Sequence, residues 1–148
     1  MNNIRDVFSI FHDGGIIDFT GDLNKLTLKI QCNYLAELIN PRFEDFYIEL
    51  TDIKNLNFDP WMNPIDLTKR LFDNYKEYLK ANLDIISAEI KDDNVLVTCY
   101  QHNTNLDYCG GNLTISANDV KVYDHDNNPI TIEQLDSVCR LYWNKFGK

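Results

Sequence analysis

Apolar and polar residues alternate along much of the chain, as they do in strands that bury one face. The clearest alternation covers residues 24–35. Because successive side chains of a strand point to opposite faces, this segment is predicted to be a strand with one face toward solvent. The apolar positions are Leu26, Leu28, Ile30, Cys32 and Tyr34, and the polar positions are Lys25, Thr27, Lys29, Gln31 and Asn33.

Turn-forming residues divide the rest of the first half into short elements. An amphipathic stretch is followed by His12, Asp13 and two glycines, which favour a turn because Asp bonds to its own backbone and Gly accepts positive φ. Gly21-Asp22 predicts a hairpin between residues 16–20 and the strand described above. The other predictions in this half are a loop over residues 36–43 and strands over residues 46–50 and 56–58.

The apolar period then changes from two to four. Asn63 is expected to cap a helix, and Pro64 suits the first helical position. An apolar stripe with a spacing of four residues follows, so we expect a helix that packs on a sheet. The stripe consists of Leu67, Leu71, Tyr75 and Leu79.

The second half shows a similar order of patterns. A hairpin is predicted over residues 85–99, followed by strands around residues 113–115 and 120–122. A final helix is expected after Asn128-Pro129-Ile130, where Thr131 and Gln134 are spaced to form a capping box.

These patterns predict an α+β fold, with a mostly antiparallel sheet and two main helices in a single domain over residues 1–148. Aligned without gaps, Ile16-Ile17 meets Ile85-Ile86. This alignment predicts a duplicated ββββα unit, with repeats at residues 15–82 and 84–147. The alternative is that two unrelated segments share the same pattern.

Charge narrows the classes of partner. The formal net charge is −9, which repels phosphate backbones and anionic lipid and attracts basic surfaces. We therefore expect neither nucleic acid nor membrane as a partner. The N-terminal residues show no export signal, and four cysteines are too few for a disulfide scaffold, so we expect a cytoplasmic protein with reduced thiols. Solubility alone is the alternative explanation of the acidic charge.

No catalytic or metal-binding motif is complete. Cys99, His102 and Cys109 are ligand types that zinc prefers, but no second ligand pair follows, and Cys99 lies at an inward strand position. The turn that starts at Asp124 resembles a calcium loop but has Pro129 where glycine is required. We therefore expect no metal and no cofactor. A Cys109 nucleophile with His102 as base stays an alternative, as does a turn at the following glycines.

Two short segments are candidates for partner binding. Phe58, Asp59 and Trp61 lie in what is predicted to be a Pro-containing connection, and Trp is frequent among interface hot spots. Asp124 and Asp126 would supply acidic groups in a polar turn. A Trp that folds back over the core is the alternative for the first segment.

A short turn motif suggests a relationship to other proteins. The motif is Phe11-His12-Asp13-Gly14-Gly15-Ile16-Ile17. It resembles the turn of small, mostly uncharacterised bacterial proteins, some of which look like immunity proteins of toxin systems. The resemblance extends to residues 26–35 and 58–61 and implies no catalytic residue.

The sequence thus favours a non-enzymatic cytoplasmic binding protein, with an immunity protein that covers a basic toxin or nuclease as its specific form. A small hydrolase or transferase that uses Cys109 and His102 is the first alternative. A self-associating structural domain that uses a strand edge or Trp61 is the second.

Overall fold

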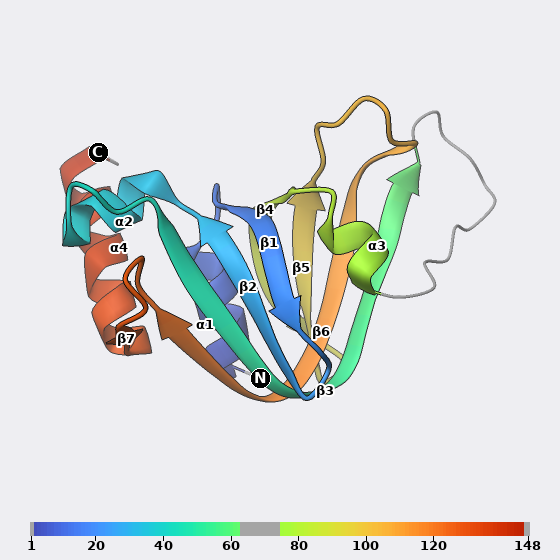
Figure 1. Ribbon diagram of the computed structural model, residues 1–148, viewed down its shortest axis with the longest axis horizontal. Coiled ribbons are helices and arrows are strands. Elements are labelled where there is room, and N and C mark those ends of the chain that lie inside the picture. Colours follow the sequence, from blue (N-terminus) through green and yellow to red (C-terminus); the bar gives the residue numbers. More distant parts are fainter. Residues whose placement is uncertain (1, 63–74, 147–148) are drawn as a thin grey trace.

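The computed structural model describes residues 2–62 and 75–146 and shows an α+β fold built around an antiparallel sheet (Figure 1). The described strands are β1 (Gly15–Gly21), β2 (Lys25–Gln31), β3 (Asp45–Met62), β4 (Leu83–Lys91), β5 (Asn94–Tyr100), β6 (Tyr108–Tyr123) and β7 (Pro129–Ile130). The described helices are α1 (Asn2–Ile10), α2 (Asn33–Ile39), α3 (Tyr75–Leu79) and α4 (Ile132–Phe146).

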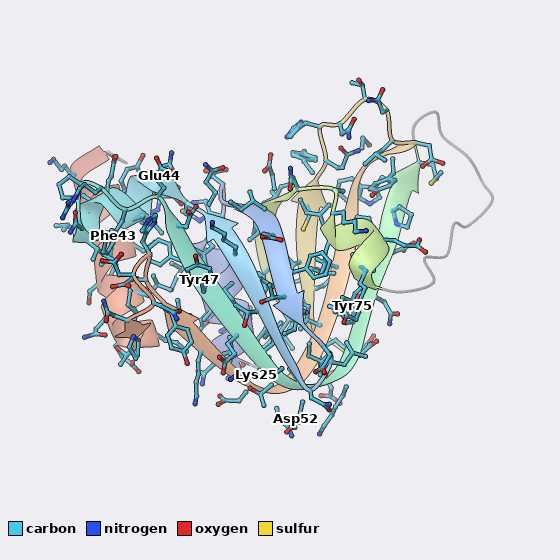
Figure 2. The ribbon with its side chains drawn as sticks, viewed as in Figure 1. Lys25, Phe43, Glu44, Tyr47, Asp52 and Tyr75 are labelled. Atoms are coloured by element: carbon cyan, nitrogen blue, oxygen red, sulfur yellow. The ribbon has the colours of Figure 1, made fainter. Side chains whose placement is uncertain are left out.

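The sheet closes on itself through its two long strands. The strand order is β3-β2-β1-β4-β5-β6-β7, and β3 also pairs with β6 along most of its length. The first part of β3 pairs with β2, and the first part of β6 pairs with β5, so each long strand joins the two hairpins. Asp52 has φ 52° at the bend of β3, and the register with β6 shifts just beyond it. Figure 2 shows Asp52 at this bend.

The core lies inside this closed sheet. The predicted alternation of β2 is confirmed, since Leu26, Leu28 and Ile30 are buried and the residues between them are not. In α1, Ile4, Val7 and Phe8 are buried because their spacing of three to four residues places them on one helix face. Helices α2 and α4 lie at one end of the sheet and α3 lies at the other, whereas α1 lies behind the strands and packs against β4 and α4 (Figure 1).

Two predicted boundaries are wrong. The strand predicted over residues 24–35 ends at Gln31. Helix α2 covers residues 33–39, which were predicted as the end of that strand and the first part of the loop over residues 36–43. Leu35 and Ala36 are both buried there, which a strand with alternating faces does not allow but a helix does.

The predicted connection over residues 58–62 is also wrong, because it belongs to β3. The strands predicted separately over residues 46–50 and 56–58 are one strand, and those over residues 113–115 and 120–122 are both part of β6. A bend and a register shift, not a turn, separate their two parts. Of the helix predicted from Asn63, residues 63–74 lie outside the described part, and α3 is its described remainder.

The two hairpins share one register. Ile16 pairs with Ile30, and the residues 69 positions later, Ile85 and Cys99, pair in the same way. A register shift follows immediately in each hairpin, before Asp18 and before Ser87. Exchanging β1 with β4, β2 with β5 and β3 with β6 leaves the pairings among these six strands unchanged, whereas β7, which pairs with β6, has no counterpart among the described strands. A duplicated origin is compatible with this arrangement and stays a prediction.

Candidate protein-binding surface

One row of directly paired residues crosses six strands and returns to the strand where it began. Residues paired directly across a sheet present their side chains on the same face. The row starts and ends on β3, so the sheet is strongly staggered and brings distant segments together at its upper side in Figure 1. Its members are Asp45, Gln31, Gly15, Asp84, Tyr100, Gly110 and Trp61.

Two exposed aromatic residues, Trp61 and Tyr100, form what we call the aromatic rim. Their exposed fractions are 36% and 50%, and their ring centroids lie 6.1 Å apart in an edge-to-face arrangement. Gly110 lies between them on β6. A Cβ atom there would lie 3.1 Å from the Trp61 ring and 2.3 Å from the carbonyl oxygen of Cys99. The glycine therefore allows both aromatic residues to cover this part of β6.

Glycine is equally required one residue later. A Cβ atom at Gly111 would lie 2.4 Å from the carbonyl oxygen of Asp59 and 2.7 Å from the ring of Phe58. The sequence interpretation of these glycines as a turn between strands is wrong, because both lie within β6. They permit close approach of β3.

His102 and Cys109 lie beside the rim but contact different partners. The Nε2 atom of His102 is 2.9 Å from Oδ2 of Asp84, whereas the Cys109 thiol donates to the carbonyl oxygen of Trp61 at 3.6 Å. Cys99 lies inside the sheet, where burial, followed by the negative charge of Asp84, raises the pKa of its thiol to about 12. Within residues 2–62 and 75–146, no group of three or more His, Cys, Asp or Glu side chains could hold a metal ion.

A cavity of about 460 Å³, the Asp13–Asp84 pocket, opens next to this row. The turn before β1 supplies Asp13, the start of α2 supplies Asn33 and Tyr34, and the start of β4 supplies Asp84. The Oδ1 atom of Asp84 lies 3.0 Å from the place where a Cβ of residue 15 would be, so Gly15 leaves space for this carboxylate.

The turn motif builds one wall of the pocket. Asp13 has φ 67°, and its N–H donates to the carbonyl oxygen of Ile85 at 2.8 Å. The Tyr34 hydroxyl donates to the carbonyl oxygen of His12 at 2.6 Å, and the His12 ring stacks on Trp143 with centroids 5.2 Å apart. The two residues of the motif therefore have different roles. His12 holds the turn in place, and Asp13 lines the pocket.

Besides the carboxylates of Asp13 and Asp84, the described pocket wall contains two ionisable groups, the Cys32 thiol and the Tyr34 hydroxyl. Burial raises the pKa of the Cys32 thiol to about 12 and raises the pKa of the Tyr34 hydroxyl above its ordinary range. Both side chains line the pocket and stay uncharged at pH 7. None of the described residues that line it is Lys or Arg.

The partner-binding candidates from the sequence do not form one site. Trp61 and Asp59 are exposed near one end of the β3–β6 pair, but Phe58 is buried and stacks on Tyr78 with centroids 5.3 Å apart. Asp124 and Asp126 follow the other end of that pair. Phe58 is thus a core residue and not a surface anchor.

Asp124 is also buried, and its carboxylate shapes the turn. Its Oδ1 accepts the N–H groups of Asp126 and Asn128, both at 2.9 Å. Asp126 remains exposed. The acidic turn is therefore formed by local backbone bonding, as Asp residues commonly do in turns.

The sequence patterns did not identify the buried carboxylate of Asp45 near this turn, or the half-buried Lys29 and His125 beside it. Asp45 is 7% exposed, and its Oδ2 lies 3.7 Å from Nζ of Lys29 and 3.8 Å from Nδ1 of His125. Its Oδ1 has no hydrogen-bond partner among the described residues. The His125 ring stacks on Phe43, which Figure 2 shows with Glu44 just before β3. Neighbouring residues across strands supply this cluster, so spacing along the chain could not reveal it.

Comparisons with protein-family models, with curated proteins and with solved structures find no significant match. No described helix has the length and apolar character needed to cross a membrane. The chain is therefore described by its own structure. It is an acidic α+β protein with a closed antiparallel sheet, an exposed aromatic rim and an acidic pocket beside the rim.

Proposed function

We propose that this chain is a non-catalytic binding protein that contacts a basic surface of another protein through its aromatic rim. The exposed pair Trp61 and Tyr100 carries the proposal. Both residues lie on hydrogen-bonded strands, so little conformational entropy would be lost when a partner covers them. Trp and Tyr are also the residue types that contribute most often to interface hot spots.

Charge near the rim favours a basic partner. Asp59 lies two residues from Trp61 on the same strand, and Asp84 is paired directly with Tyr100. Residues two apart on a strand and directly paired residues share a face, so both carboxylates lie on the side of the rim. Together with the net charge of −9, they would attract Lys and Arg side chains and orient an approaching partner.

The immunity-type function is the specific form of this proposal. It is supported by the acidic charge and by the resemblance of the Phe11–Ile17 segment to proteins that look like immunity proteins. The partner would then be a basic toxin or nuclease, encoded next to this chain, whose surface the rim covers.

The test is a binding measurement with the purified product of the adjacent gene. Trp61→Ala is expected to weaken the complex about tenfold or more, the effect of a typical hot spot. Leu141→Ala is the control, because Leu141 is a 57% exposed apolar residue on α4. The complex is also expected to weaken between 50 and 300 mM salt. A complex that Trp61→Ala leaves unchanged, or no complex at all, would refute the proposal.

Self-association is a second candidate function. Beyond Ile53, none of the described strands other than β6 pairs with β3, so one edge of the later part of β3 lacks a strand partner within the described chain. Tyr78 donates to the Leu56 carbonyl on this strand. A dimer in light scattering at micromolar concentration would favour this function. A monomer would contradict self-association and would leave the binding proposal unaffected.

A further inference from the structure

We infer that the Asp13–Asp84 pocket receives the guanidinium group of an arginine on the partner protein. The inference rests on the proposed function and adds a specificity determinant to it. A partner that covers the aromatic rim would reach this pocket, since Asp84 lies beside Tyr100 in the same row of paired residues.

Backbone pairing fixes the main-chain positions of Asp13 and Asp84 at the pocket. Asp13 is held at φ 67° by hydrogen bonds that join the turn to β4: Asp13 donates to Ile85, and Ile85 donates to Gly14, both at 2.8 Å. Asp84 is paired with Gly15 where β4 meets β1. The pocket is therefore formed before a ligand arrives, which lowers the entropic cost of binding.

One carboxylate oxygen of Asp84 contacts His102, and the other can accept a hydrogen bond from a ligand in the pocket. Oδ2 lies 2.9 Å from Nε2 of His102, and this contact orients the carboxylate. Oδ1 lies above the backbone of Gly15, which also lines the pocket. A guanidinium in the pocket would thus have two carboxylates, Asp13 and Asp84, in the wall around it.

The remaining wall favours arginine over lysine or a metal ion. Gln31, Asn33 and Asn82 add side-chain amide groups, whose oxygens can accept hydrogen bonds, and Tyr34 adds an aromatic ring. Guanidinium is planar, has five N–H donors and stacks on aromatic rings, whereas ammonium is a compact charge with three donors. The volume of about 460 Å³ also exceeds what a bare ion requires.

The test uses N-acetyl-arginine-amide as the probe, titrated into the full chain and followed by backbone amide chemical shifts. Saturable shifts are expected at Asp13, Tyr34 and Asp84, with a dissociation constant in the millimolar range. N-acetyl-citrulline-amide has nearly the same shape but no charge. It is expected to bind at least about tenfold more weakly, because the carboxylates lose their charged partner.

Two variants locate the site. Asp84→Asn removes one charge, and Gln31→Lys places a competing cation at an exposed strand position in the wall. Each is expected to weaken arginine binding about tenfold. Asp126→Asn is the matched control, because Asp126 is an exposed carboxylate at the far end of β6, and it is expected to change nothing.

Shifts that do not saturate would overturn the inference. Equal binding of citrulline, or binding that neither variant at the pocket weakens, would also overturn it. The proposed function fails separately: a complex that depends on Trp61 can exist without arginine binding, and the arginine probe can bind while Trp61→Ala leaves the complex intact.

Discussion

Individual residues at the upper side of the sheet show how neighbours fix the exposure of a side chain. Tyr100 follows three inward residues of β5 at alternate positions, so its outward direction agrees with the alternation of the sequence. The contact with Trp61 does not follow from alternation. It depends on Gly110, which belongs to a third strand and leaves space for the Trp61 ring next to the backbone of Tyr100.

The buried thiol of Cys99 predicts a loss of stability at alkaline pH. Its pKa rises from 9.0 to about 12 in the folded chain, so between these values the unfolded state loses a proton that the folded state keeps. The stability contribution is complete below pH 9 and is lost as pH rises toward 12. The unfolding free energy should therefore fall by about 1 kcal/mol per pH unit through this thiol.

Urea unfolding of the wild type and of Cys99→Ala at several pH values tests this prediction. The difference between the two chains should be constant from pH 6 to 8, because the thiol is protonated in both states there. Above pH 9.5 the wild type should lose stability more steeply. Parallel curves over the whole range would contradict a buried, neutral Cys99.

At the scale of elements, sequence patterns predicted a structure correctly where both interacting residues lie close together in the chain. The capping box predicted before the last helix is confirmed: the Thr131 N–H donates to Oε1 of Gln134 at 2.9 Å, and the Gln134 N–H donates to Oγ1 of Thr131 at 3.1 Å. Both partners lie three residues apart, so tertiary contacts are not needed to form the motif.

Replacement of Thr131 by Ala should destabilise the protein by about 1 kcal/mol, the usual effect of a lost N-cap. The cap precedes α4, which anchors its first turn through fully buried Leu135. Urea unfolding followed by circular dichroism measures the change. Thr131→Ser keeps the hydroxyl and should retain most of the stability. Equal losses in both variants would show that the hydroxyl hydrogen bond is not the cause.

Elements that depend on distant partners were predicted less well. The alternation of residues 24–35 continues past the end of β2 at Gln31. Helix α2 begins there because Leu35 and Ala36 are buried together, in a region where α2 packs against α4 and β3. The length of β3 likewise depends on β6, which accompanies it through a bend that resembled a turn in the sequence.

At the scale of the molecule, β3 and β6 connect the two hairpins into one cooperative structure. The pairings form a closed ring, so neither hairpin can separate without breaking both its ladder with a long strand and its pairing with the other hairpin. The two tryptophans report on different regions, since Trp61 lies at the end of β3 and Trp143 lies in α4. Both regions should unfold in one transition.

Single-tryptophan variants test this expectation. In Trp61→Phe and in Trp143→Phe, the fluorescence of the remaining tryptophan should follow the same urea curve as circular dichroism. Each variant provides its own control, since both signals come from one sample. A fluorescence transition that precedes the dichroism transition would instead show that the two regions unfold separately.

The sequence by itself determined the α+β class, the inward face of β2 and the cap of the last helix. Periodicity and capping operate between residues a few positions apart, so one chain segment contains the whole signal. Closure of the sheet, the aromatic rim and the pocket between Asp13 and Asp84 were decided only by the tertiary structure. Their residues come from segments far apart in the chain, and strand pairing with its stagger brings them together.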